Sequence, residues 1–223
     1  MSADETATLA RAIDHTLLRP DATAAQVDRL LAEAREHAFA SVCLPPVYVA
    51  QAKAALAGTS VHTGTVVGFP LGYVVPAVRI AESRQAIADG ADELDTVLNV
   101  SWLKSGDDAR VLGDLAGWVA AARAERRDLM LKVILETALL TDDEKERGTR
   151  LAVEAGADYV KTSTGFAQGG ATVADVELLA RVAAGRLGVK ASGGIRDRAT
   201  ALAMLRAGAT RLGTSSGVAI VRG

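Results

Sequence analysis

Short apolar runs and longer amphipathic segments follow one another in a regular order along this chain. The apolar runs contain many β-branched residues and stop at glycine, proline or polar residues, which is typical of buried strands. They predict strands over residues 12–16, 39–44, 61–67, 93–97, 129–135, from 159, 189–192 and 211–213. Helical spacing, capping residues and glycine stops predict helices over residues 7–11, 21 or 23–37, 47–56, 76–89, 106–126, 141–155, 172 or 175–184, 197–207 and from 215.

The order of these elements predicts the fold class. Regular alternation of strand and helix implies parallel strands joined by crossover helices. Eight such units in 223 residues, without a linker, predict a single-domain closed (β/α)8 TIM barrel over residues 1–223. An open doubly wound sheet is the alternative. It is disfavoured because no Gly-x-Gly-x-x-Gly follows the first long strand, and because eight strands are many for an open sheet of this size.

Composition and charge exclude several classes of protein. The chain is 49% hydrophobic and 23% charged with a formal net charge of -2, so neither disorder nor nucleic-acid binding is indicated. No apolar run reaches membrane-spanning length, and the acidic N-terminus does not resemble a secretory signal. The single cysteine, Cys43, suits a reducing cytoplasm. The three histidines lie far apart without ligand spacing, so we expect no zinc site. The expectation for this chain is no metal and no cofactor.

Lysine is used sparingly and in unusual places. Only six of the 25 basic residues are lysines, yet Lys132, Lys161 and Lys190 all fall within predicted strands. Strands of a parallel barrel are buried on both faces, so an ammonium group there must be paired, neutral or chemically employed. Because lysine can lose its proton and arginine cannot, this placement indicates that the amine itself is needed.

Further polar residues and glycines map to the same ends of the predicted strands, where barrel enzymes build their sites. Two lysines sharing a cavity with Asp14 and Asp95 would repel each other, and one amine would then be neutral and able to form a Schiff base with an aldehyde or ketone. A buried Lys–Asp network without chemistry is the alternative. The residues assigned to this end are Asp14, Cys43, Asp95, Lys132, Glu136, Lys161, Lys190, Gly193, Gly194, Ser215 and Ser216.

Two small polar loops follow the seventh and eighth predicted strands. They are residues 192–194 (SGG) and 213–216 (GTSS). Barrel enzymes frequently bind phosphate at these two positions through backbone N–H groups and a short helix. The loop 162–165 (TSTG) can likewise hold an oxygen-rich ligand.

Seven segments of the chain together resemble the 2-deoxyribose-5-phosphate aldolase family, from about residue 9 to the end. The lysine-containing segments are the most specific of them. The segments are 14–18 (DHTLL), 67–72 (VGFPLG), 93–99 (ELDTVLN), 131–137 (LKVILET), 160–166 (VKTSTGF), 189–196 (VKASGGIR) and 212–216 (LGTSS).

The resemblance implies roles for individual residues. Lys161 would form the Schiff base, Lys190 would help it lose its proton and join proton transfer, and Asp95 would act as acid and base through a water. Asp14 and Lys132 would support them. Phosphate would bind the glycines and serines of the two loops together with the preceding polar loop: Gly165, Gly193, Gly194, Ser215 and Ser216.

The same resemblance implies reversible cleavage of 2-deoxy-D-ribose 5-phosphate to D-glyceraldehyde 3-phosphate and acetaldehyde, in the catabolism of deoxyribose phosphate. The expected partners are these small phosphosugar and aldehyde molecules, without nucleic acid or membrane. A Schiff-base aldolase with another substrate and a non-catalytic phosphosugar-binding protein are the rival hypotheses. A homodimer is possible, but no apolar patch decides the oligomeric state.

One departure from the family concerns the end of the chain. Some members carry a C-terminal tail whose tyrosine helps proton transfer, whereas this sequence ends in AIVRG without a tyrosine. The expectation is that a tail is not required, or that the proton relay is slower or arranged differently. Cys43 matches a cysteine near the pocket of relatives, but we expect it to act as a small buried apolar side chain.

Overall fold

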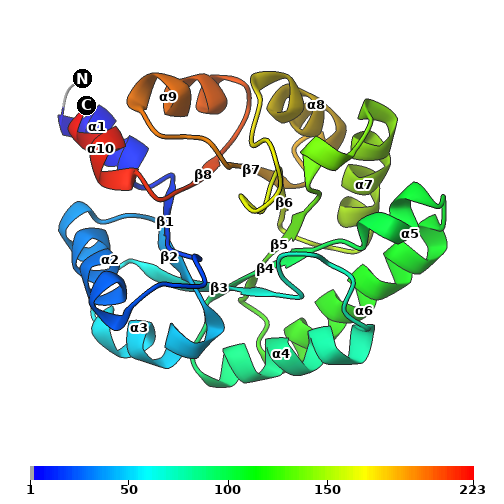
Figure 1. Cartoon of the computed structure of the whole chain (residues 1–223), viewed down its shortest axis with the longest axis horizontal. Coiled ribbons are helices and arrows are strands. Elements are labelled where there is room, and N and C mark those ends of the chain that lie inside the picture. The colour runs from blue at the N-terminus through cyan, green and yellow to red at the C-terminus, as the bar shows by residue number, and fades with distance from the viewer. Residues whose placement is uncertain (1–2) are drawn as a thin grey trace.

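The computed structural model describes residues 3–223 as a closed barrel of eight parallel strands surrounded by helices (Figure 1). The strands follow one another around the barrel in sequence order, and the last pairs with the first. They are β1 (Ile13–Thr16), β2 (Ser41–Leu44), β3 (His62–Val67), β4 (Glu93–Val97), β5 (Met130–Ile134), β6 (Tyr159–Lys161), β7 (Gly188–Ser192) and β8 (Arg211–Thr214). The predicted (β/α)8 barrel is confirmed, and each predicted strand end lies within two residues of the observed one.

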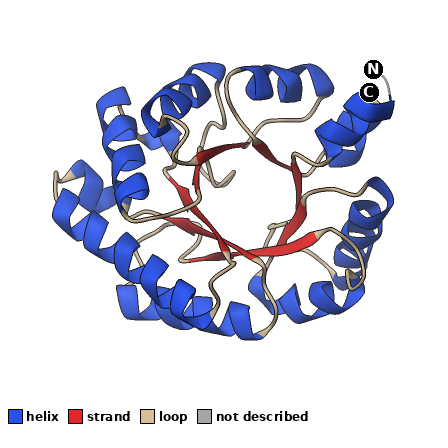
Figure 2. Ribbon diagram, turned by 180° about the vertical axis from the view of Figure 1, so that it is seen from behind, coloured by secondary structure: helices blue, strands red, loops and turns tan. Residues whose placement is uncertain are grey.

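The helices lie outside the ring of strands, as Figure 2 shows from the opposite side. Two of the short segments are 3-10 turns that lead out of strands β2 and β5. The helical elements are α1 (Ala3–Ala10), α2 (Ala24–His37), η1 (Pro46–Tyr48), α3 (Val49–Ala55), α4 (Pro76–Ala88), α5 (Val100–Lys104), α6 (Asp108–Glu125), η2 (Thr137–Leu139), α7 (Asp142–Glu154), α8 (Val173–Ala183), α9 (Arg198–Arg206) and α10 (Gly217–Arg222).

Helix starts follow from side chains that accept backbone N–H groups. Thr23, rather than Asp21, caps α2, and its backbone N–H in turn donates to the Gln26 side chain at 2.9 Å. Thr172 caps α8 by accepting the N–H of Asp175 at 3.0 Å. The contact is reciprocal at Thr23 and one-way at Thr172, and both caps satisfy N–H groups that the first helical turn leaves unpaired.

Three helical segments differ from the sequence prediction. The helix predicted over 7–11 begins at Ala3 instead. The helix predicted over 47–56 opens as the 3-10 turn η1. Helix α5 was not predicted, because five residues are too few to show a helical period; the Asn99 side chain caps it by accepting the N–H of Trp102.

Alternate residues of each strand face two different environments. Leu94, Val133 and Leu212 belong to a continuous apolar core that also includes helix residues such as Trp118. On β1, β4, β5, β7 and β8, intervening positions carry charged side chains, and these meet inside the barrel; Asp95, for example, lies in register with Lys132 on the adjacent strand. The barrel therefore has an apolar outer layer and a charged interior.

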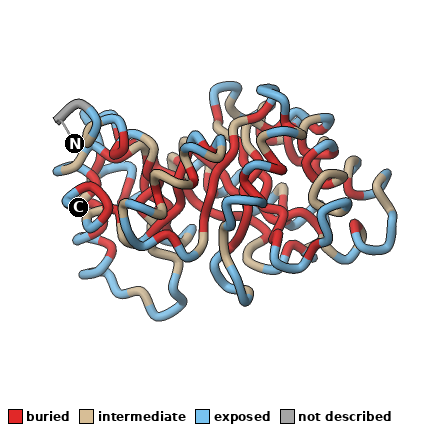
Figure 3. Tube along the Cα trace, turned by 90° about the horizontal axis from the view of Figure 1, so that it is seen from above, coloured by how far each residue is buried: buried red, intermediate tan, exposed pale blue. Residues whose placement is uncertain are grey.

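Burial is concentrated in the middle of the molecule, where the strands lie, while many outer loops and turns are exposed (Figure 3). The first and last helices, α1 and α10, pack against each other, so the described ends of the chain lie together (Figure 1). Within residues 3–223, the helices are too short or too polar to cross a membrane.

Candidate active site

The charged side chains inside the barrel form a closed ring in which acidic and basic groups alternate. Each acidic member is paired with a basic member on either side. We call this set the charge ring. Its members, in order around the ring, are Asp14, Lys190, Asp95, Lys132, Glu93 and Arg211.

Two lysines make one half of the charge ring. The Nζ atom of Lys190 lies 2.5 Å from Asp14 Oδ2 and 2.8 Å from Asp95 Oδ2. The Nζ atom of Lys132 lies 2.9 Å from Asp95 Oδ1 and 2.6 Å from Glu93 Oε2. All of these side chains are fully buried, so each lysine is held between two carboxylates away from water.

Arg211, the first residue of β8, closes the other half. Its Nε donates to Asp14 Oδ1 at 2.7 Å, and its Nη2 donates to the two oxygens of Glu93 at 2.6 and 2.8 Å. Glu93 is also 3.1 Å from Nδ1 of His62, whose side chain is half exposed at the start of β3. The sequence reasoning missed Arg211, although an arginine in a buried strand is the same anomaly that singled out the lysines.

Pairing outweighs burial in setting the charges of the ring. Burial alone would lower the pKa of Lys190, but the carboxylates of Asp14 and Asp95 raise it instead. Burial alone would raise the pKa of Asp95, but its three lysine neighbours hold it well below the ordinary range. The pKa of Lys132 is raised and that of Glu93 lowered for the same reason, so these groups stay ionised at neutral pH. The repulsion expected between the lysines therefore does not neutralise Lys190 or Lys132.

Lys161 stands outside the charge ring. It is the last residue of β6, and its Nζ donates to Asp95 Oδ2 at 2.8 Å, the oxygen that also accepts from Lys190. It contacts one carboxylate, whereas Lys132 and Lys190 each contact two. Of the three interior lysines, it is also the one that borders the open cavity.

A cavity of about 320 Å³ lies at the C-terminal ends of β1, β6, β7 and β8. Among the described residues, its lining includes three basic side chains and no carboxylate, so it suits an anionic ligand. The lining residues are Thr16, Leu17, Leu18, Arg19, Lys161, Thr164, Gly165, Phe166, Ser192, Gly193, Gly194, Ile195, Arg196, Gly213, Thr214 and Ser215.

The two predicted phosphate loops meet on one wall of this cavity. Two features require glycine at position 193. Its φ is +89°, and an added Cβ would lie 2.9 Å from the Cα of Gly170. Gly194 also has a positive φ of +80° but faces open space. Ser215 is exposed on the wall, whereas Ser216 is not a lining residue and donates its N–H to the Thr214 hydroxyl at 2.9 Å.

Of two other predicted residues, Glu136 has different surroundings from those expected, and Cys43 has the expected ones. Glu136 does not share a site with Lys132, because the chain turns at Glu136 with φ of +59° and its carboxylate accepts from the Thr164 hydroxyl. Cys43 is buried, and burial raises the pKa of its thiol to about 11. It is therefore a neutral group at physiological pH, as expected of a small buried side chain.

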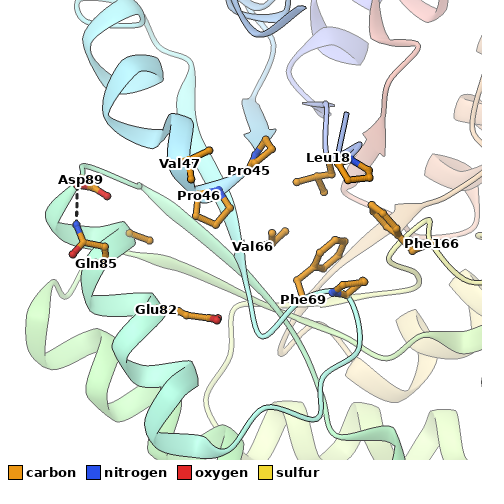
Figure 4. A pocket seen from close by; sticks show the side chains of 13 residues that line it. Leu18, Pro45, Pro46, Val47, Val66, Phe69, Glu82, Gln85, Asp89 and Phe166 are labelled. Carbon is orange, nitrogen blue, oxygen red and sulfur yellow. Dashed lines mark hydrogen bonds between the residues drawn. The ribbon is translucent and has the colours of Figure 1, made fainter. Parts of the chain in front are cut away.

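An apolar groove of about 570 Å³ adjoins the cavity and shares Leu18 and Phe166 with it (Figure 4). Phe69 and Phe166 meet edge to face on its wall, with ring centroids 5.3 Å apart. Among the described residues that line the groove, Glu82 and Asp89 are acidic and none is basic. The two hollows thus differ in charge, and an anionic ligand is directed to the cavity above Lys161.

Within residues 3–223, no group of three or more His, Cys, Asp or Glu side chains is arranged to hold a metal ion. The groups that the barrel does bring together are amines and carboxylates. They can form a Schiff base, stabilise a cationic intermediate and move protons.

Comparison with known proteins places this arrangement in a family. The chain is 56% identical over 211 residues to the deoxyribose-phosphate aldolase of Brevibacillus brevis, covering 95% of this chain and 94% of that one. It is 53% identical, with the same coverage, to that of Streptococcus suis. A solved deoxyribose phosphate aldolase from Aeropyrum pernix, described as tetrameric, aligns with a TM-score of 0.89 at 35% identity, over 100% of this chain and 97% of that one. A model of the DeoC/LacD family aldolases matches residues 8–223, and the chain belongs to that family.

Proposed function

We propose that this protein is a class I, Schiff-base aldolase that reversibly cleaves 2-deoxy-D-ribose 5-phosphate to D-glyceraldehyde 3-phosphate and acetaldehyde. This reaction would serve the catabolism of deoxyribose phosphate. The observation that carries the proposal is the position of Lys161, which borders an anion-suited cavity while the other two interior lysines are held between carboxylates. The relatives named deoxyribose-phosphate aldolase support the choice of substrate.

The charge ring explains why Lys161 can be the nucleophile. Three acidic and three basic members leave the ring neutral without Lys161, so a proton on Lys161 gives the buried cluster a net positive charge. Burial disfavours such an uncompensated charge. Lys161 is thus the one interior lysine whose positive charge the ring does not need for its balance, and a neutral amine is the form that attacks an aldehyde.

The first chemical step joins Lys161 to the substrate. The amine attacks C1 of the open-chain sugar, and the carbinolamine takes up one proton and loses water to give an iminium ion. The iminium is positively charged, and Asp95 Oδ2, which lies 2.8 Å from the amine nitrogen before reaction, is placed to stabilise that charge.

The second step breaks the C2–C3 bond, because acetaldehyde takes C1 and C2 of the sugar. The C3 hydroxyl loses its proton and becomes the aldehyde of glyceraldehyde 3-phosphate, while the bonding electrons pass to the iminium and form an enamine. A proton then adds to C2, and water releases acetaldehyde and the free amine. We assign proton transfer to Asp95 and Lys190 acting through a water, because Lys190 and Lys161 donate to the same Asp95 oxygen.

Asp14 and Lys132 act through these groups. Asp14 pairs with Lys190 at 2.5 Å, and Lys132 pairs with the other oxygen of Asp95 at 2.9 Å. Each contact fixes the orientation of a group to which proton transfer is assigned, Lys190 in one case and Asp95 in the other. We therefore assign them positioning roles.

An assay of substrate choice tests the proposed function. With 2-deoxy-D-ribose 5-phosphate we expect release of glyceraldehyde 3-phosphate, measured by a coupled dehydrogenase, and acetaldehyde in equal amounts. D-Ribose 5-phosphate serves as the control because it differs only at C2. Turnover of another phosphosugar at a higher kcat/KM would favour the rival hypothesis of a Schiff-base aldolase with a different substrate. Binding without turnover of any sugar would favour a non-catalytic protein.

We assign the phosphate to the wall formed by Gly165, Gly193, Gly194 and Ser215, with Ser216 at the start of α10 behind it. We expect Ser215→Asp to raise KM for the phosphorylated sugar by on the order of 10-fold or more, because like charges then meet at the phosphate. KM for unphosphorylated 2-deoxyribose should change little.

Two variants serve as controls for this assignment. Ser216→Asp should have a smaller effect, because Ser216 does not line the cavity. Ser101→Asp adds the same charge to the exposed surface of α5 and should leave both KM values unchanged. Equal effects of Ser215→Asp on both sugars would place the phosphate elsewhere.

The location and assembly of the chain complete the proposal. A cytoplasmic location is supported by its single, buried cysteine, which forms no internal disulfide. A homodimer is supported by exposed apolar side chains at the start of α4, Val75 and Val78. Sedimentation velocity measured over a range of protein concentrations determines whether the chain is a dimer, a monomer or a larger assembly.

A further inference from the structure

Arg211 lies opposite Asp95 in the charge ring, three ion pairs away in either direction, and Asp95 is the member that contacts Lys161. It does not occur among the described residues that line the cavity, and it donates its hydrogen bonds to Asp14 and Glu93. Each partner of Arg211 pairs with a lysine that contacts Asp95. Asp14 pairs with Lys190, and Glu93 pairs with Lys132. Any effect of Arg211 on the reaction therefore passes through the ring.

The guanidinium supplies one of the three positive charges that balance the ring. Arginine does not lose its proton under physiological conditions, and its pKa here is raised further because Asp14 and Glu93 outweigh burial. Removing it leaves three carboxylates facing only Lys132 and Lys190. A proton on Lys161 would then restore neutrality instead of adding an uncompensated charge.

The other strands contribute few further charges to this balance. Cys43 on β2 is neutral because burial raises the pKa of its thiol to about 11. His62 on β3 contacts Glu93, and that hydrogen bond raises the pKa of its half-exposed ring. Arg19 and Arg196 line the cavity together with Lys161, and the buried Glu136 accepts from Thr164 on the same wall. None of these three residues is changed in the variants below, so their charges are the same in every comparison.

We propose that Arg211 is a positioning residue that keeps Lys161 available as a neutral nucleophile by completing the charge balance of the ring. This inference rests on the proposed function, because it takes Lys161 as the Schiff-base lysine. It predicts that charge changes at the far side of the barrel move the pH at which Lys161 reacts. It also predicts that paired changes which restore the balance cancel each other.

The test measures the pH dependence of three variants of the full chain. Arg211→Gln should move the rising limb of the kcat/KM profile to higher pH by up to about one unit, no more than the lower end of the range for an adjacent charge, because Arg211 is connected to Lys161 only through the ring. Glu93→Gln removes a negative charge instead and should move the limb to lower pH. The double variant has a balanced ring again and should return the limb close to its wild-type position.

A buried arginine elsewhere provides the matched control. Arg79 is fully buried between α4 and α6, where it pairs with Asp114 at 3.1 Å. Arg79→Gln also removes a buried cation and should destabilise the protein, but the limb should keep its wild-type position. A shift in Arg79→Gln as large as that in Arg211→Gln would mean that loosened packing, rather than ring charge, moves the profile.

Trapping of Lys161 separates the inference from the proposed function. Borohydride with acetaldehyde, followed by peptide mass spectrometry, measures the adduct at Lys161 as a function of pH. Absence of the adduct in the wild type would overturn the proposed function itself. An adduct that forms with the same pH dependence in wild type and in a folded Arg211→Gln would overturn only the role of Arg211.

Folding of each variant is checked by circular dichroism. If Arg211→Gln does not fold, Glu93→Gln and the double variant still test whether the charge balance of the ring sets the pH at which Lys161 reacts. A limb that moves to lower pH in Glu93→Gln and returns in the double variant supports the proposal. If the rising limb of the kcat/KM profile kept its wild-type position in both Glu93→Gln and the double variant, the ring would stabilise the fold without affecting the pH at which Lys161 reacts.

Discussion

Replacement of Lys161 by alanine should abolish aldol cleavage while leaving the barrel folded. The loss in kcat/KM should be on the order of 10⁵-fold or more, the scale found when a covalent nucleophile is removed. The fold should survive because the charge ring is balanced without Lys161, and Asp95 keeps Lys132 and Lys190 as partners. Activity is measured by release of glyceraldehyde 3-phosphate, and folding by circular dichroism and thermal unfolding.

Labelling with acetaldehyde and borohydride gives the same prediction a chemical readout. A two-carbon adduct should form at Lys161 in the wild type and be absent in Lys161→Ala. Lys104→Ala, which removes a surface lysine paired with Glu144, should label and react like the wild type. An adduct found on Lys190 or Lys132 instead would overturn the assignment of the nucleophile.

Replacement of Lys190 by leucine should change both the pH dependence and the maximum rate. The change removes a positive charge of the ring at similar bulk, so Lys161 should keep its proton to higher pH and the rising limb should move upward. Activity at pH 7 should fall on the order of 100-fold or more, because a proton-transfer group is also lost. It should recover only in part towards pH 9, which distinguishes this variant from Arg211→Gln.

The arginine variant isolates the two effects of Lys190. Lys190→Arg keeps a positive charge between Asp14 and Asp95 but supplies no transferable proton. It should be slow at every pH, with the rising limb near its wild-type position. If Lys190→Leu showed the wild-type limb as well, Lys190 would not tune Lys161, and burial alone would have to do so.

Much of the fold could be predicted from local patterns. The alternation of apolar runs and amphipathic segments predicted eight strands in a closed barrel, because buried parallel strands and covering helices each have their own period. Capping residues such as Thr23 and Thr141 predicted where helices begin. The five-residue helix α5 was not predicted, because so short a segment shows no helical period.

The anomalous residues of the site were also visible in the sequence. Lysines within predicted buried strands indicated amine chemistry, and small polar loops after the last two strands indicated an anion site. The relative roles of the lysines follow only from the resemblance to a family. Mutual repulsion does not by itself choose among them, and the structure adds that carboxylates on both sides keep Lys132 and Lys190 charged.

By itself, then, the sequence determined the order of the elements, the apolar outer layer and the set of amines within the barrel. Only the tertiary structure decided how those amines are paired. Asp14 and Arg211 are 197 positions apart and become partners because closure of the barrel brings β8 beside β1. Electrostatic pairing depends on distance in space, which local patterns do not contain. The closed charge ring, and the position of Lys161 outside it, therefore emerge only when the eight strands meet.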